Sequence, residues 1–436
     1  MKATVTIFSK LKYFTVIVLA AISVSCESWL DLGSEDRIME KDLFSTQTGF
    51  MTALNGVYIE LMGSNLYGGT LMHKTFDVMA QYYNCRVEGQ ETHSMERLSQ
   101  FEPSSKAASV SGMWSTTYTL LVNLNVIIEA CDSKRGVLTD QYYHVIKGEA
   151  LALRALLHFE LFRVFGPIYS EDPDQVCIPY ANSSELILRP LLKASEVVRL
   201  IMEDFRAAEL LLKDYDPVIK DGPLFADAGP GIPNDMVYRP MRLNYYAVKA
   251  YIARAALYTG DRTTAKEYAQ QVIRETQEDN KWFPFVTRAA ATTAQKWDRI
   301  YKTEILFGAY NLKRVNFYDY TFSSQLGASV LLRPTTENIE ALYEESTRVN
   351  DWRYTEQWMT QKDTEGESKK FFVKYMAVDD TDSKGVSQGY SYIVPLMRIS
   401  EMHLIAAECL GEGEEAYGYI DKVREARGVA KVSRDL

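Results

Sequence analysis

Residues 82–86 place aromatic rings beside hydrogen-bonding groups in the order Tyr82, Tyr83, Asn84, Cys85 and Arg86. A tyrosine ring offers a flat apolar face and a hydroxyl. That combination suits a surface that binds sugars, because the C–H faces of a sugar stack on rings and its hydroxyls need hydrogen-bond partners. The pattern indicates a binding surface. The alternative is that these rings pack a loop onto the rest of the protein.

Other aromatic residues are candidates for the same surface. Tyr67, beside two glycines, is close in sequence to the first stretch, and residues 317–320 form a second aromatic stretch. The candidates from this second stretch are Phe317, Tyr318 and Tyr320, and weaker candidates are Trp282 and Trp297. The chain has 28 Tyr, 18 Phe and 6 Trp, so we expect most of these rings to fill the edges of the core instead.

Motifs of common catalytic and cofactor sites are missing from the sequence. The five histidines, at positions 73, 93, 144, 158 and 403, show no metal-ligand spacing, and no nucleophile elbow or glycine-rich phosphate loop is present. A glycosidase carboxylate pair stays open as an alternative, because acidic residues are plentiful. Asp379, Asp380 and Asp382 lack the rest of an EF-hand and indicate a solvated charge run. We predict no catalytic residue, no metal and no cofactor.

Cys26 ends a segment with the pattern of a secretory signal peptide. Three lysines precede an apolar run over residues 13–24, which is too short to span a membrane. A cysteine at the first mature position predicts a bacterial lipoprotein, with Cys26 acylated after removal of residues 1–25. Ser23 departs from the usual leucine of the cleavage motif. The alternative is a secreted protein in which Cys26 is incidental.

Composition limits the function classes. The 436 residues are 47% hydrophobic and 24% charged, which is ordinary for a globular protein with a sizeable core. The formal net charge is −10 and the sequence contains no basic block. This balance argues against nucleic acid as a partner and against docking on anionic lipid.

The sequence predicts that helices hold the candidate residues in place. Residues 142–165 carry Ile146, Ala150, Leu153, Leu157 and Leu161 on one face, and a Gly-Pro pair ends this helix. Residues 242–259 form an alanine-rich helix, and a Gly-Asp turn at 260–261 leads into a returning helix over residues 262–274. Helix, glycine turn and alanine-bearing helix is the layout of a tetratricopeptide-type hairpin.

The same layout predicts four helix pairs. The expected pairs are 49–62 with 113–130, 142–165 with 192–212, 242–259 with 262–274, and 397–410 with 414–427. The predicted fold class is therefore mainly α, a right-handed scaffold of tetratricopeptide-like helix pairs. The alternative is a helical protein without regular stacking.

Long irregular inserts interrupt the predicted scaffold at about residues 64–112, 214–240 and 280–392. The second insert is rich in proline and glycine, and the third is aromatic. Loops of this length are usually functional, so we expect a loop-rich layer over the scaffold, with a few short strands such as Glu304–Tyr310. Residues 26–45 are then a tether, and residues 46–436 a single domain.

Several segments together resemble the SusD/RagB family of surface nutrient-binding lipoproteins from Bacteroidetes. The start Cys26-Glu27-Ser28-Trp29-Leu30-Asp31 is similar to an acylated cysteine followed by aromatic-Leu-Asp. Residues 53–58, 147–168, 398–408 and 423–428 resemble further family motifs, in the family's order. Family members usually continue beyond the Arg427-Gly428 turn into another helical segment. This chain stops at residue 436, so a truncated end is an open alternative.

The resemblance implies a lipid-anchored protein of the outer membrane that faces the extracellular side. It would capture an oligosaccharide, or less often a peptide, and deliver it to a SusC-like TonB-dependent transporter. Arg154, Arg398 and Glu401 lie in the motif helices, where bracing of neighbouring helices is the expected role. The alternatives are a surface glycoside hydrolase and an assembly subunit without a small ligand.

Overall fold

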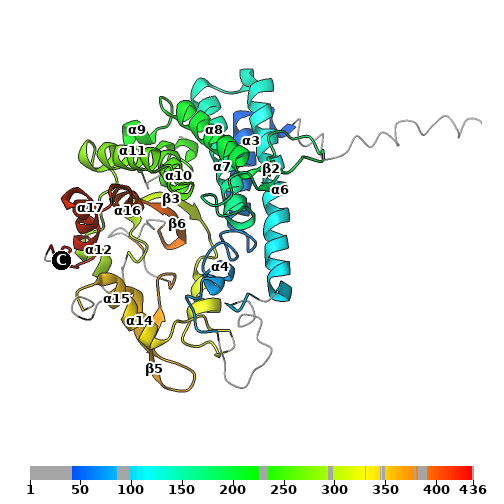
Figure 1. The fold of residues 1–436 in the computed structure, drawn as a ribbon. Helices are drawn as coiled ribbons and strands as arrows, with labels where there is room; N and C mark the ends of the chain where they lie inside the picture. The colour runs from blue at the N-terminus through cyan, green and yellow to red at the C-terminus, as the bar shows by residue number, and fades with distance from the viewer. Residues whose placement is uncertain are drawn as a thin grey trace, which may run out of the picture.

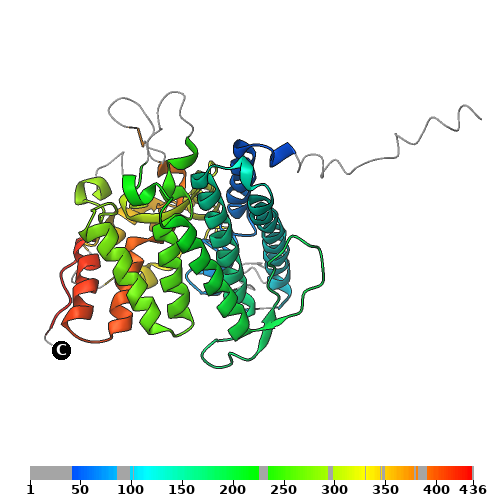
Figure 2. The same cartoon turned by 90° about the horizontal axis from the view of Figure 1, so that it is seen from above.

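The computed structural model describes residues 42–85, 99–101, 103–224, 234–292, 298–328, 330–343, 345, 349–377, 380–381 and 390–434. Long helices lie side by side in a row, and an irregular layer covers one side of this row (Figures 1 and 2). Among the described residues, no helix combines the length and apolar character that crossing a membrane requires.

The row is formed by eight helices, each of which contacts the next. In order they are α3 (Gln47–Leu61), α6 (Pro103–Ser133), α7 (Asp140–Phe165), α8 (Ala194–Leu212), α10 (Tyr245–Tyr258), α11 (Arg262–Ile273), α16 (Ile399–Leu410) and α17 (Glu414–Glu425). These are the eight helices that the apolar periodicity predicted, and the mainly α fold class is confirmed.

Helix boundaries differ from the predictions where polar side chains cap a helix. Asn244 accepts a hydrogen bond from the Ala247 amide, so α10 begins after residue 244 and not at residue 242. Thr139 caps α7 in the same way, which moves the start of that helix ahead of residue 142. Helix α6 already begins at Pro103, so the first irregular insert is shorter than residues 64–112.

The rest of the described structure contains short helices and three antiparallel strand pairs. Its helices are α4 (Thr75–Met79), α9 (Val218–Asp221), α12 (Arg288–Thr292), α13 (Val315–Phe317), α14 (Thr336–Leu342) and α15 (Trp352–Gln357). The pairs are β1 (Val176–Ile178) with β2 (Leu192–Lys193), β3 (Ile305–Tyr310) with β6 (Ile393–Arg398), and β4 (Trp358–Lys362) with β5 (Ser368–Phe372). Strand β3 confirms the predicted strand. In Figure 1, α14, α15 and β5 lie on the opposite side of β3 and β6 from α10 and α11.

Helix α7, the third in the row, is buried on all faces along most of its length. Its polar side chains therefore need partners inside the protein. Arg154 donates two hydrogen bonds to the Asp204 carboxylate, at 2.7 and 2.6 Å, and a third to Asn125 Oδ1 at 2.8 Å. Arg154 braces α7 against α8 and α6, as expected for its motif. In the same way, Glu401 accepts from Arg254 Nε at 2.6 Å.

Glu149 on α7 is fully buried in a second charged network. It accepts hydrogen bonds from Arg239 at 2.5 Å, from Arg242 at 2.8 Å and from the Tyr58 hydroxyl at 2.7 Å. Arg239 in turn donates to both oxygens of Asp216, at 2.8 and 2.9 Å. Two cations and two carboxylates thus compensate one another where α3, α7 and the segment before α10 meet.

Candidate functional site

A hollow of about 620 Å³ lies in the irregular layer between α4, α14 and the β4–β5 hairpin. We call it the aromatic cleft. Its aromatic lining residues are Tyr82, Tyr83, Phe322, Trp358, Phe372 and Tyr375. A ligand pocket of this size with mostly apolar walls and a few polar groups is typical of small-molecule sites.

The rings at the base of the aromatic cleft pack on one another and are held in place. The Phe372 ring centroid lies 5.1 Å from that of Trp358 and 5.3 Å from that of Phe322. Trp358 donates its indole N–H to the Tyr343 hydroxyl at 3.1 Å. Tyr82 differs, because 63% of its surface is exposed. The cleft therefore offers a fixed aromatic base and one exposed ring at its border.

Polar groups reach the aromatic cleft from several elements. Asp77 of α4 accepts a hydrogen bond from the Tyr83 hydroxyl at 3.2 Å, and burial raises the pKa of this carboxyl above its usual value. Gln81, Asn338 and Lys374 also line the cleft. The amide, carboxylate and ammonium groups supply both donors and acceptors beside the rings.

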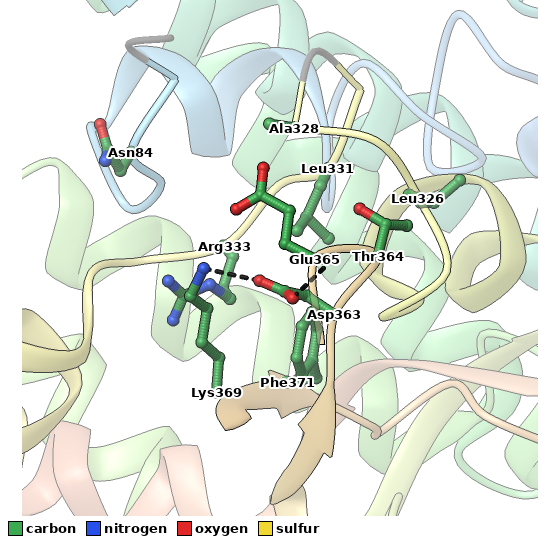
Figure 3. Close-up of a pocket in the computed structure, with 10 residues that line it drawn as sticks. All are labelled: Asn84, Leu326, Ala328, Leu331, Arg333, Asp363, Thr364, Glu365, Lys369 and Phe371. Atoms are coloured by element: carbon green, nitrogen blue, oxygen red, sulfur yellow. Dashed lines mark hydrogen bonds and ion pairs between the residues drawn. The ribbon is translucent and has the colours of Figure 1, made fainter. Parts of the chain in front are cut away.

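A second hollow of about 420 Å³, the polar hollow, lies on the other face of the β4–β5 hairpin. Figure 3 shows Asn84 on one side of it and the hairpin residues Asp363 and Glu365 on the other, with Arg333 and Lys369 between them in this view. The backbone amide of Asn84 donates to the Arg333 carbonyl at 2.9 Å, which joins the two segments that border both hollows. Within the described part of the chain, the buried Arg333 Nη1 has no hydrogen-bond partner.

The β4–β5 hairpin is the shared wall of the two hollows. Trp358 pairs with Phe372 across the hairpin, and both line the aromatic cleft. Lys369 and Phe371 line the polar hollow. Successive side chains of a strand point to opposite faces, so one strand supplies both walls.

Three carboxylates at the hairpin turn, from Asp363, Glu365 and Glu367, have oxygen atoms within 4.8 Å of one another. The Lys369 ammonium lies 2.6 Å from Asp363 and 2.8 Å from Glu367. The other oxygen of Asp363 accepts the amides of Glu365 and Glu367, each at 2.9 Å. Lys369 thus pairs with two of the three carboxylates, and Asp363 is bonded within the turn, so we assign no metal to this group.

The first candidate stretch lies at the border of both hollows. Tyr82 and Tyr83 line the aromatic cleft, and Asn84 lines the polar hollow. Arg86 of the same stretch lies outside the described residues, as do Trp297 and Cys26.

Several other candidates lie in the core, where they have no free face for a ligand. Tyr67 is 6% exposed and donates its hydroxyl to Glu160 on α7 at 3.0 Å. Phe317 is 7% exposed and stacks on His73 with a centroid distance of 4.0 Å. Tyr318 is also buried and donates to Gln361 at 3.1 Å. Each of these rings packs the irregular layer onto its neighbours, so the structure favours Tyr82 over them as a ligand contact.

Two further candidates, one exposed and one half-buried, line neither hollow. Tyr320 is 73% exposed and lines neither the aromatic cleft nor the polar hollow. Trp282 packs against Tyr246, with ring centroids 6.0 Å apart. From the second aromatic stretch, it is the next ring, Phe322, that reaches the cleft.

Five residues of the hairpin and the segment after it were not predicted from the sequence as part of the site: Trp358, Lys369, Phe372, Lys374 and Tyr375. They lie in the third insert, which was predicted to be irregular. The Asp-Thr-Glu-Gly sequence at 363–366 is a turn signal that could have indicated a hairpin here, because glycine at 366 has a φ of +84°. That signal would have placed the strands but not their contact with residues 82–84.

Family models match almost the whole chain. A model described as SusD-like, "Starch-binding associating with outer membrane", matches residues 28–257. A SusD family model matches residues 224–435. This chain belongs to the SusD/RagB family. The resemblance seen in the sequence motifs is thereby confirmed, and a comparison with curated proteins gives no match.

Solved structures of other SusD-like proteins share this fold. A SusD-like carbohydrate binding protein from Bacteroides vulgatus is 19% identical, with 90% of this chain and 77% of that chain covered and a TM-score of 0.64. A laminarin binding SusD-like protein is 17% identical over 89% and 86%, with a TM-score of 0.60. The surface glycan-binding protein A of Bacteroides uniformis is 15% identical over 89% and 82%, with a TM-score of 0.61.

Proposed function

We propose that this SusD family protein binds an oligosaccharide across the aromatic cleft and the polar hollow, without cleaving it. The observation that carries the proposal is the exposed Tyr82 ring beside a fixed aromatic base and several hydrogen-bonding groups. A sugar ring can stack on Tyr82 while its hydroxyls bond to polar groups of the cleft. Because the base is already rigid, little conformational entropy is lost on binding.

The relatives support a glycan as the ligand class. The family model is described as starch-binding, and one structural neighbour is a laminarin binding protein. The two hollows differ in character, since one is aromatic and the other is bordered by Arg333, Asp363 and Lys369. Neighbouring units of one oligosaccharide can thus meet different surroundings on either side of the hairpin.

Replacement of Tyr82 by alanine should weaken binding about tenfold, because a stacked ring contributes on the order of 1–2 kcal/mol. Affinity electrophoresis against a panel of polysaccharides first identifies a polymer that retards the wild-type protein. Titration calorimetry with an oligosaccharide of that polymer then measures the affinity of both proteins. Tyr320→Ala is the matched control, because it removes an equally exposed tyrosine that lines neither hollow.

The same experiment separates the other hypotheses. A loss of affinity with Tyr320→Ala but not with Tyr82→Ala would move the site to the second aromatic stretch. Sustained release of new reducing ends from the polymer would identify a glycoside hydrolase and contradict binding without cleavage. An absence of retardation by every polymer would favour a peptide ligand or an assembly subunit.

We also propose delivery of the glycan to a SusC-like TonB-dependent transporter, with Cys26 as the lipid anchor on the outer membrane. The support is the family description, which places related proteins at the outer membrane, and the signal-like segment before Cys26. Acylation of that thiol would hold the protein beside its transporter while leaving both hollows in water.

Membrane fractionation tests the anchor and the partner together. The wild-type protein should sediment with membranes, and mild detergent should release it with a large outer-membrane barrel protein. Cys26→Ala should appear in the soluble fraction, because it cannot be acylated, whereas Cys85→Ala should fractionate like the wild type. Retention of Cys26→Ala on membranes would contradict the anchor, and a detergent extract without a barrel partner would contradict the transporter complex.

A further inference from the structure

Lys374 is a cation in the aromatic cleft, and none of the carboxylates in the described residues pairs with it. It follows strand β5 and lines the cleft together with Tyr375, whose ring centroid lies 5.4 Å from its ammonium. The other lysine of this wall that lines a hollow, Lys369, is paired with Asp363 and Glu367. For Lys374, the described residues contain no carboxylate within ion-pair distance, and Asp77 acts on it only from further away.

Two arginines add positive charge to the surroundings of Lys374. Arg314, which is 2% exposed, donates to the Lys374 carbonyl at 3.3 Å and to the Ser391 carbonyl. Arg398 also acts on the Lys374 ammonium. Asp77 is the carboxylate that acts on Lys374, whereas Asp298 and Asp380 act on Arg314. A half-buried ammonium without a paired anion loses part of its hydration, and an anionic ligand would offset that loss.

His73 adds a second unsatisfied group to the same cleft. It is 5% exposed, and its buried Nδ1 has no hydrogen-bond partner among the described residues. Both His73 and Gln81, another lining residue, have left-handed backbone conformations, with φ of +55° and +61°. Non-glycine residues in this conformation are strained, and such strain gathers at ligand sites. The cleft base thus contains an imidazole nitrogen that the described residues do not satisfy.

We propose that the aromatic cleft takes a glycan unit that carries a carboxylate or a sulfate group, and that Lys374 pairs with this anion. The His73 imidazole supplies a hydrogen bond to the same unit. The proposal rests on the proposed function, since it specifies the ligand class of the same site. An ammonium in a pocket shielded from water forms a strong charge-assisted bond to an anion, and this interaction discriminates against a neutral sugar.

The protonation of Lys374 then sets the pH dependence. Burial, followed by the charges of Arg398 and Arg314, lowers the pKa of Lys374 to about 7. Of the other groups that face it, His73 has a pKa lowered to about 4 by burial, Arg314 one lowered to about 10, and Tyr375 one raised to about 12. The pKa of Asp77 is raised from an acidic value, and that of Tyr83 is raised further above its usual range. Lys374 therefore changes charge within the neutral range.

Titration calorimetry with matched oligosaccharides tests the proposal on the full-length protein. Trigalacturonate is compared with its methyl ester, and a sulfated galactan oligosaccharide with the same oligosaccharide after desulfation. In one of the two pairs, we expect the charged member to bind roughly tenfold or more tightly than its neutral partner. A preference in the galacturonate pair identifies a carboxylate as the anion, and a preference in the galactan pair identifies a sulfate. Affinity for the preferred charged member should fall by about tenfold from about pH 6 to about pH 8.5, as Lys374 loses its proton.

Two substitutions of Lys374 assign the effect to this residue. Lys374→Met should abolish the preference for the charged member, whereas Lys374→Arg should keep it and lose the pH dependence, because arginine stays charged. Lys362→Met is the matched control, since Lys362 is exposed on β4 and lines neither hollow. Thermal unfolding verifies that each variant is folded.

Each remaining outcome overturns the proposal. Binding of neutral members alone, or equal binding of charged members by the wild type and Lys374→Met, contradicts the anionic ligand and leaves the proposed glycan function standing. An absence of binding by every charged and neutral oligosaccharide contradicts the anionic ligand. If the polysaccharide panel also fails to retard the protein, the proposed glycan function fails with it.

Discussion

Arg239→Met should lower the free energy of unfolding by about 3–5 kcal/mol, because it leaves buried carboxylates without their cation. Arg239 is 1% exposed and bonds to both Glu149 and Asp216, each of which has a fully buried side chain. After the substitution, Glu149 keeps Arg242 as its cation, whereas Asp216 keeps only backbone amide donors. Urea unfolding followed by circular dichroism measures the change. Arg199→Met is the control, because its ion pair with Glu203 is exposed and should contribute less than about 1 kcal/mol.

The loss of unfolding free energy caused by Arg239→Met should become smaller at low pH. Burial alone would raise the pKa of Glu149, but Arg242, Arg239 and the Tyr58 hydroxyl outweigh it and hold that pKa below its usual value. In the wild type, Glu149 therefore stabilises the fold above the pKa of unfolded glutamate, and this contribution is lost as the pH falls through its lower folded value. Without Arg239 the carboxyl accepts a proton more easily, so the variant loses less stability in acid. A deficit that is constant from about pH 4 to about pH 7 would contradict this account.

A second large effect is expected at Arg427, which connects the end of α17 to β3. Its guanidinium donates to both oxygens of Glu304, at 2.7 and 2.5 Å, and lies 4.4 Å from the Tyr301 ring centroid. The Glu304 side chain is fully buried. Arg427→Met should therefore lower the free energy of unfolding by about 3–5 kcal/mol, because Glu304 then keeps a buried charge without a partner.

A double substitution separates the loss of the pair from the loss of packing. Arg427→Met with Glu304→Gln should recover most of the deficit, because glutamine is neutral and still accepts the Val286 amide, which lies 3.0 Å from Glu304. Lys431→Met, which removes an exposed pair with Glu425, is the control. If the double variant were as unstable as Arg427→Met alone, packing and not charge would explain the effect.

The helical row could be predicted because its signals are local. Apolar spacing along 142–165 and 242–259, and the glycine turn at 260, each depend on residues that are close in sequence. The partners of Glu149 and Arg154 could not be predicted, because Arg239 and Asp204 are distant in the chain and reach them only after folding. Helix α7 is buried on all faces, so its polar residues do not indicate a solvent-exposed side.

The site could be predicted only in part for the same reason. Adjacent aromatic and amide groups in residues 82–84 gave a local signal, and these residues do border the two hollows. Tyr67 and Phe317 gave a similar signal but pack in the core, since a tyrosine at a core edge and one at a surface have the same sequence appearance. Trp358 and Lys374 join the cleft through pairing of β4 with β5, which no short window of sequence specifies.

The alternation along β5 has a consequence for how this protein can change its specificity. Phe371 and Phe372 are neighbours in sequence but face different hollows, with Lys369 on the side of Phe371 and Trp358 on the side of Phe372. Insertion or deletion of one residue in β5 would turn each following side chain to the other face. A single codon gained or lost in this hairpin would therefore exchange charged and aromatic surfaces between two sugar-sized compartments, while the helical row stayed unchanged.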